Sequence, residues 1–168
     1  MRVPTIALLL MSATAASAGE IQDLRRNSGV AAVEQAGSSF GEAADHGITE
    51  IGIERTACYG WCPIYTFIVK SDGNFRYTGE DYVKRKGSFT GTVPKYDFNM
   101  LAQFIALSGY VALADGYTNA VTDNPTVFTM VVMNGQRKIV SNYANAGPKE
   151  LWAIEELIDH LLDKATWN

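Results

Sequence analysis

Residues 64–77 read IYTFIVKSDGNFRY, a stretch that holds a strand, a turn and the start of a returning strand. Its first seven residues, 64–70, are mainly β-branched or aromatic, and such residues favour strands. Asp72-Gly73 follows, and an Asp-Gly pair tolerates the positive φ angles of a tight hairpin turn. Phe75 and Tyr77 then alternate with polar residues, as in a half-buried strand. The stretch therefore predicts an antiparallel hairpin, and the rest of the fold is built outward from it.

The apolar residues elsewhere extend this pattern to a complete fold. Shorter runs with strand character occupy residues 50–54, 87–93, 126–133 and 137–142. Asn134-Gly135 separates the last two runs and is a strong signal for a second hairpin. Two amphipathic helices are expected where apolar residues recur at helical spacing, first at Phe98, Leu101, Ala102 and Ile105, and then at Leu151, Ile154, Ile158, Leu161 and Ala165. The order β-meander, helix, β-hairpin, helix predicts an α+β fold, an antiparallel sheet with both helices packed on one face.

The first 18 residues have the pattern of a cleavable export signal. Arg2 supplies the positive charge, residues 5–11 (TIALLLM) supply the apolar stretch, and Ala16-Ser17-Ala18 is a small-residue cleavage site. The apolar stretch is too short to span a bilayer, which takes about 20 residues. We therefore expect cleavage near Ala18 and a mature protein that is periplasmic or secreted, with no membrane span.

The mature chain is expected to be one domain preceded by a leader. Residues 19–47 are rich in Ala, Gly, Ser and Glu, a composition typical of a flexible leader, in which Ile21, Leu24 and Val33 allow one short, frayed helix. A single α+β domain is expected over residues 48–168. The net charge of the whole chain is −4, and the one basic run is 84–86. Because phosphate binding needs clustered Lys and Arg, no nucleic-acid partner is expected.

Cys58 and Cys62 are the two cysteines of the chain and lie within RTACYGWCPIY, residues 55–65. An even cysteine count in an exported protein favours a disulfide. Gly60 lets the chain fold back between them, which a disulfide requires. Closing so small a loop contributes only about 2 kcal/mol in the chain-entropy relation. The main effect of the bond is therefore expected to be local, fixing how Tyr59 and Trp61 are displayed.

The motif around the cysteines carries a family resemblance. Cys58-x-Gly60-x-Cys62-Pro63-x-Tyr65, followed by Asp72-Gly73, resembles an exported bacterial family catalogued as domain of unknown function 6438. The resemblance extends to the helix around Leu101, to Asp123 and to the closing helix with Trp167. It implies a domain over about residues 48–168 and an exported, often envelope-associated context. It implies no established activity, so no catalytic residue is carried over.

Two other uses of the cysteine pair stay open at this point. The pair could be redox-active, because a nearby cation such as Arg55 lowers the pKa of a thiol. Cys-x-x-x-Cys-Pro also resembles the motif of copper-delivery proteins of the Sco type, over these six residues alone, and two thiolates suit Cu(I). That family uses a distant histidine, and the histidines here are His46, in the leader, and His160, at the polar border of the final helix. The alternative function is thus a thiol-disulfide oxidoreductase or a Cu(I)-handling protein.

The sequence favours a non-enzymatic binding or envelope-accessory module over these alternatives. Its candidate binding residues are Arg55, Tyr59, Trp61 and Tyr65, because aromatic and arginine side chains commonly anchor interfaces. An envelope protein or a small ligand is the expected partner, and the sequence indicates no oligomeric state. No catalytic residue, metal ligand or cofactor is expected. The acidic pair Glu155-Glu156 is expected on the outer face of the last helix.

Overall fold

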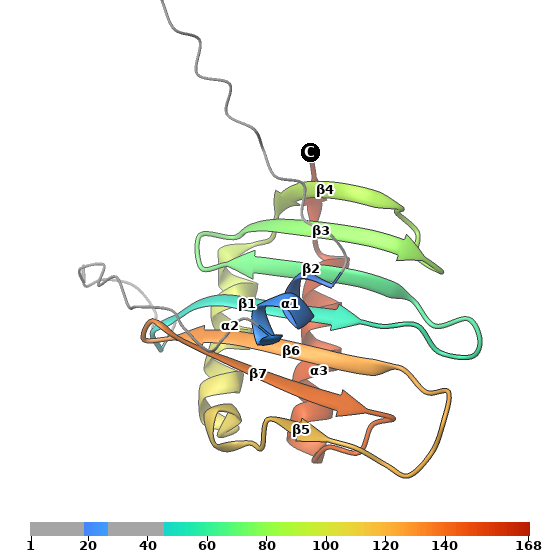
Figure 1. The fold of residues 1–168 in the computed structure, drawn as a ribbon. Coiled ribbons are helices and arrows are strands. Elements are labelled where there is room, and N and C mark those ends of the chain that lie inside the picture. The colour runs from blue at the N-terminus through green and yellow to red at the C-terminus, as the bar shows by residue number, and fades with distance from the viewer. Residues whose placement is uncertain (1–18, 27–45) are drawn as a thin grey trace, which may run out of the picture.

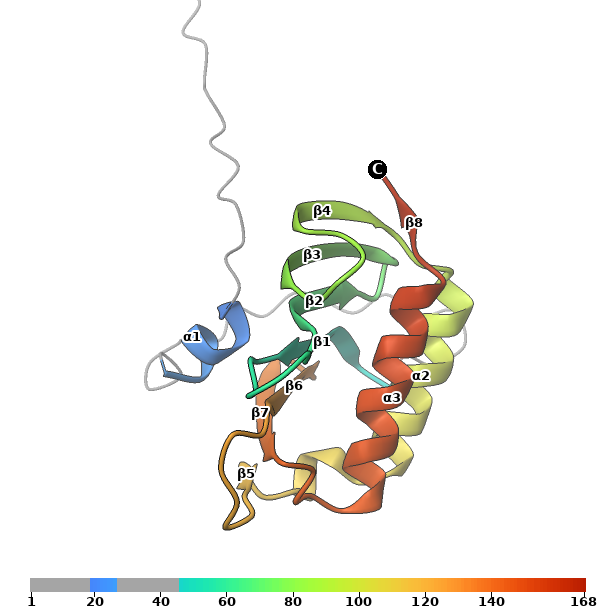
Figure 2. The same cartoon turned by 90° about the vertical axis from the view of Figure 1, so that its right-hand side faces the viewer.

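The computed structural model describes residues 19–26 and 46–168. Their strands form one eight-stranded sheet in the order β5-β7-β6-β1-β2-β3-β4-β8. Figure 1 shows this order from β5 to β4, and β8 is labelled in Figure 2. Neighbouring strands are antiparallel except β5 and β7, which are parallel. The strands are β1 (Ile48–Arg55), β2 (Ile64–Lys70), β3 (Asn74–Asp81), β4 (Gly87–Thr92), β5 (Gly116–Tyr117), β6 (Thr126–Met133), β7 (Gln136–Tyr143) and β8 (Thr166–Trp167). The predicted α+β class is confirmed.

The two predicted hairpins organise this sheet. In the β2–β3 turn Gly73 has φ +89°, and in the β6–β7 turn Asn134 and Gly135 have φ +51° and +75°. These are the left-handed angles that Asp-Gly and Asn-Gly turns require. Strand β1 joins the two halves, since it pairs with β2 on one side and with β6 on the other. The cysteine-containing connection, residues 56–63, therefore leaves the sheet from its centre.

Helices α2 (Lys95–Leu107) and α3 (Lys149–Asp163) lie side by side on one face of the sheet, as Figure 2 shows. The apolar stripe of each helix enters a single core with residues of the sheet, including Ile51, Ile53 and Phe67. The 3-10 turn η1 (Tyr110–Ala112) follows α2 and buries Tyr110 in the same core. The phenol of Tyr110 donates to the carbonyl of Thr129 at 2.8 Å, so this buried hydroxyl is satisfied.

Helix α1 (Glu20–Arg26) packs on the opposite face of the sheet (Figure 2). Its Ile21 is fully buried in a second cluster with Ile68, Phe128, Met130 and Ile139. Gly52 of β1 favours this approach, because a Cβ there would lie 3.1 Å from the end of the Ile21 side chain, closer than an ordinary contact. This part of the segment expected to be a flexible leader is thus a docked helix. Residues 27–45 of that segment lie outside the described residues, as does the expected export signal over 1–18.

Two short edge strands, β5 and β8, were not predicted from the sequence. Each has two residues, too few for any alternation of apolar and polar side chains to be recognised. Strand β8 places Trp167 beside Phe75 and Tyr77, with ring centroids 5.1 and 5.2 Å apart. The C-terminal residues therefore complete an aromatic cluster at one edge of the sheet. None of the helices in the described ranges has the length and apolar character needed to cross a membrane.

Candidate functional site

A disulfide between Cys58 and Cys62 closes the loop that connects β1 to β2, and the two Cα atoms are 5.8 Å apart. We call residues 58–62 the disulfide loop. Its backbone is tied to the rest of the protein, because the amide of Tyr59 donates to the carbonyl of Asp123 at 3.0 Å. Thr56, just before the loop, exchanges hydrogen bonds with the backbone of Thr126. The loop is therefore held at its tip and at its base, as well as by the disulfide.

The disulfide loop presents two aromatic side chains to solvent. Tyr59 is 89% exposed and Trp61 is 86% exposed. Trp61 packs edge-on against Tyr82, which belongs to the β3–β4 connection and is itself 45% exposed, with ring centroids 5.2 Å apart. Two loops distant in sequence thus meet through exposed aromatic rings.

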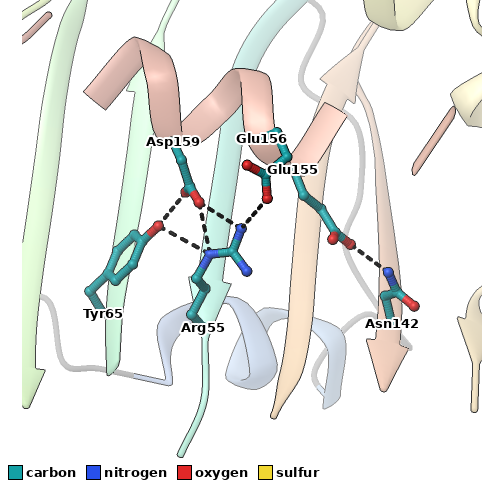
Figure 3. A network of polar contacts seen from close by, with 6 residues as sticks. All are labelled: Arg55, Tyr65, Asn142, Glu155, Glu156 and Asp159. Carbon is teal, nitrogen blue, oxygen red and sulfur yellow. Dashed lines mark hydrogen bonds and ion pairs between the residues drawn. The ribbon is translucent and has the colours of Figure 1, made fainter. Parts of the chain in front are cut away.

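Arg55 and Tyr65, the other two candidate binding residues, lie beneath the disulfide loop rather than on it. They are register partners, Arg55 at the end of β1 and Tyr65 near the start of β2. Both contact Asp159 of α3, as Figure 3 shows. The guanidinium donates to the Asp159 carboxylate from Nε at 3.0 Å and from Nη2 at 2.6 Å, and the Tyr65 hydroxyl donates to the other carboxylate oxygen. We call Arg55, Tyr65 and Asp159 the polar base of the loop.

The side chains of the polar base shift one another's pKa values. Burial, the largest single influence, lowers the pKa of Arg55, but the charge of Asp159, the neighbouring Tyr65 and the hydrogen bonds to both side chains together raise that pKa above its ordinary value. Burial first, and then the Asp159 charge, raise the pKa of Tyr65. Arg55 therefore stays charged, and Tyr65 stays a hydrogen-bond donor. The Arg55 guanidinium is engaged with Asp159, and more weakly with Glu156 at 3.9 Å, so its side chain connects the end of β1 to α3.

A groove of about 430 Å³ runs beside the polar base. Tyr65, Tyr77 and Trp167 contribute aromatic surface to its lining. Tyr65 stacks on Tyr77 with centroids 5.7 Å apart, and burial raises the pKa of Tyr77 to about 12. Tyr82 also lines the groove, so the Trp61–Tyr82 contact stands at its rim.

Charged residues of both signs line the same groove. Lys84 and Arg85 come from the β3–β4 connection, and Asp159 and Asp163 come from α3. The Arg85 guanidinium lies 4.7 Å from the centre of the Trp167 ring, a cation–π contact that orders both side chains. Two residues of the basic run, Lys84 and Arg85, thus supply part of a groove wall. The groove can offer ring faces, hydrogen-bond donors and acceptors to a single ligand.

One acidic residue of α3 departs from the sequence prediction. Glu155 was expected on the outer face of the helix, yet it is 1% exposed, whereas Glu156 does point to solvent. Glu155 accepts a hydrogen bond from Asn142 Nδ2 at 3.0 Å (Figure 3). Asn142 is buried as well. Burial raises the pKa of Glu155 to about 7, and the Asn142 hydrogen bond opposes part of that rise. The prediction failed because Asn142 of β7 provides a buried amide partner that helical spacing does not reveal.

Sequence reasoning also missed Asp159, Tyr82 and Trp167 as parts of the site. Asp159 is separated from Arg55 by 104 positions, so no local motif links the two. The one available signal was the position of Asp159 next to Ile158, at the flank of the apolar stripe, where a side chain can reach the sheet. His160 is exposed at the polar border, as expected. No group of three or more metal-ligating side chains is found in residues 19–26 and 46–168.

The model of one protein family, domain of unknown function (DUF6438), matches residues 49–162. The chain belongs to the DUF6438 family. The DUF6438 match covers the sheet from β1 to β7 and most of α3, and so it includes the disulfide loop and the polar base. A search of curated proteins returned no match. The predicted family resemblance is confirmed.

Proposed function

We propose that this protein is an exported, non-enzymatic binding module whose disulfide loop and adjoining groove recognise an envelope protein or ligand. The observation that carries the proposal is the contact between Trp61 and Tyr82, two exposed rings held together at the rim of a groove. Scattered exposed aromatics are ordinary on protein surfaces. Here Tyr59, Trp61 and Tyr82 are neither scattered nor loosely attached, because the first two lie on a cross-linked loop.

Rigid aromatic side chains suit recognition for an energetic reason. A ring contributes a large apolar area on binding and loses few rotatable bonds, so most of its burial energy is retained. Cross-linking the loop removes a further entropic cost, since its backbone is ordered before a partner arrives. Tyr59 and Trp61 are accordingly proposed as the contact residues.

The contacts of the polar base also support this proposal. Arg55 and Tyr65 flank the loop on adjacent strands, and both bind Asp159, so the ends of the loop connection are fastened to one helix. Their proposed role is to hold the loop at a fixed angle to the groove. Tyr65 contributes in addition to the groove lining.

Export and an oxidising location belong to the same proposal. A disulfide is a bond typical of oxidising compartments, and residues 1–18 have the pattern of an export signal. We place the mature protein in the periplasm or outside the cell. The Arg55 guanidinium is committed to Asp159, which argues against the thiol activation that a redox enzyme needs.

In-cell cross-linking followed by mass spectrometry tests the proposal. We expect specific cross-linked partners of the full-length, exported protein to be lost in the double variant Tyr59→Ala, Trp61→Ala. Tyr96→Ala is the matched control, because Tyr96 is 72% exposed on α2. Retention of every adduct by the double variant would remove the proposed contact surface.

A further inference from the structure

A second pocket, of about 210 Å³, opens at the start of α1. Its lining includes Gly19, the residue immediately before that helix, together with Glu54 of β1, Thr66 of β2 and Glu80 of β3. Glu54 and Thr66 are register partners in the sheet. The pocket therefore brings two carboxylates and a hydroxyl together beside Gly19.

Glu54 is a buried carboxylate held by amide donors. It is 2% exposed, and it accepts hydrogen bonds from the backbone amides of Ile21 and Gln22 at 3.0 and 3.2 Å. The side-chain amide of Gln22 donates to its other oxygen. No salt bridge joins Glu54 to a cation within residues 19–26 and 46–168. Burial raises the pKa of Glu54, as expected for a carboxylate that lacks a counter-charge.

Thr66 is a second polar residue in this pocket, and the hydrogen-bonding capacity of its hydroxyl is not used within the described residues. Its Oγ1 is buried and, among the described residues, has no hydrogen-bond partner. Buried hydroxyls are nearly always paired, so a polar group placed between Thr66 and Glu54, its register partner, would meet the needs of both side chains. Glu80 adds a third set of acceptor oxygens on the exposed side of the same pocket. A small cation with several N–H donors would suit these acceptor oxygens.

We propose that this pocket is a binding site for a primary ammonium group, and that its occupant is the mature N-terminus of the protein itself. Hydrolysis of the Ala18–Gly19 peptide bond adds water across it. The released signal keeps the new carboxylate at Ala18, and Gly19 gains an amine that takes up a proton. The resulting ammonium has three donors for Glu54, Thr66 and Glu80. This inference rests on the export proposed above and concerns a different face of the sheet.

Signal removal then has a structural consequence. Before cleavage the Gly19 nitrogen is a neutral amide, and the buried charge of Glu54 stays uncompensated. After cleavage an ion pair forms at the first residue of the chain and fastens α1 to β1. Since Ile21 covers the second apolar cluster, the mature protein closes that face of the sheet more firmly than the precursor does.

An NMR titration of the Gly19 amine tests the site directly. The mature chain, starting at Gly19, is released from a fusion by a protease that leaves no extra residue. Its amine is expected to titrate at least about one pH unit above the ordinary value, which is about 7.7–8.0. Glu54→Gln keeps an acceptor oxygen for the α1 amides and should move the pKa of the amine most of the way back to its ordinary value, because only the exposed Glu80 carboxylate then remains. Glu50→Gln, the same change on the same strand but outside the pocket lining, should leave it raised.

A chain that retains Ala18 provides a second test of the site, because one extra residue moves the terminal ammonium away from the pocket. It should melt at a lower temperature than the Gly19 chain, and Glu54→Gln should abolish that difference. An ordinary amine pKa in the Gly19 chain that Glu54→Gln does not change overturns the site. Intact mass of the exported protein separates this result from a failure of the proposed processing. A mature N-terminus other than Gly19 overturns the inference through its premise, whatever the titration shows.

Discussion

The disulfide loop and its polar base lie next to each other in sequence, yet they are opposite in character. The loop carries Tyr59 and Trp61 almost fully in solvent. In the base, Tyr65 is buried and the Arg55 side chain is 17% exposed. Local cross-linking orders the first, and contacts with α3 over about a hundred positions order the second. Under the proposed function, the contacts that hold the connection in place lie below the loop and the proposed contact surface lies above it.

The largest loss of stability is expected from breaking the ion pair of the polar base. Asp159→Asn leaves the charge of Arg55 poorly compensated, because the remaining acid, Glu156, is 3.9 Å away and 55% exposed. Removing one partner of a buried ion pair costs about 3–5 kcal/mol, and the lower end applies because Asp159 is 31% exposed. Urea unfolding of the variant measures the loss. Asp163→Asn, an exposed acid on the same helix, should change stability by less than about 0.5 kcal/mol. Equal losses in both variants would contradict the role of the base.

The variant Glu155→Gln tests a second acidic side chain of α3. Unlike Asp159, which pairs with a charged arginine, Glu155 is a buried acid whose hydrogen-bond partner is a neutral amide. Its pKa rises from 4.5 to about 7 on folding, so the folded state holds a proton that the unfolded state releases. The parent protein therefore loses stability as pH rises from 4.5 to 7, by about 2–3 kcal/mol. The variant should lack this loss and be the more stable protein at about pH 8.

Unfolding measured across that pH range tests this assignment. Glu156→Gln is the control, because Glu156 lies beside Glu155 with its side chain 55% exposed. The control should keep the pH dependence of the parent protein. An unchanged pH dependence in Glu155→Gln would show that another group is responsible.

Removing the cross-link should have a smaller effect than breaking the base. The double variant Cys58→Ser, Cys62→Ser opens a five-residue loop, for which the chain-entropy relation gives about 2 kcal/mol. We expect the variant to remain folded, because the polar base still fastens both flanks of the loop. Thermal unfolding gives the loss, and NMR line widths of the Trp61 indole report loop mobility. Global unfolding at room temperature would show that the loop carries more of the stability than its size allows.

The smallest effect on stability is expected from the exposed rings. Trp61→Ala and Tyr59→Ala remove side chains that are largely in solvent, so each should change the free energy of unfolding by less than about 0.5 kcal/mol. Any loss of stability in Trp61→Ala is expected to come mainly from the Trp61–Tyr82 contact. Chemical denaturation of each variant provides the check. A loss above about 2 kcal/mol would mean that the rings belong to the core rather than to a recognition surface.

The sequence predicted the elements whose signals are local. Asp72-Gly73 and Asn134-Gly135 fix the two hairpins, and the apolar spacing in 98–105 and 151–161 fixes the two long helices. Cys58 and Cys62 were close enough in the chain for their pairing to be foreseen.

The parts that escaped prediction depend on contacts between distant residues. Asp159 meets Arg55 only after the sheet and α3 are assembled, and Glu155 is buried only because Asn142 faces it from β7. Trp167 belongs to a two-residue strand without a pattern of its own. Helix α1 docks through Ile21 and Gly52, one apolar residue and one absent side chain, which composition does not reveal.

The reduction potential of the Cys58–Cys62 pair tests the account most directly, because the rigid loop depends on a bond that persists. Equilibration of the folded mature protein with glutathione and dithiothreitol buffers, followed by alkylation and mass spectrometry, gives the value. We predict a potential below about −300 mV, which is typical of structural disulfides. A value between about −120 and −270 mV, the range of thiol-disulfide oxidoreductases, would contradict the account and favour a redox role for the pair.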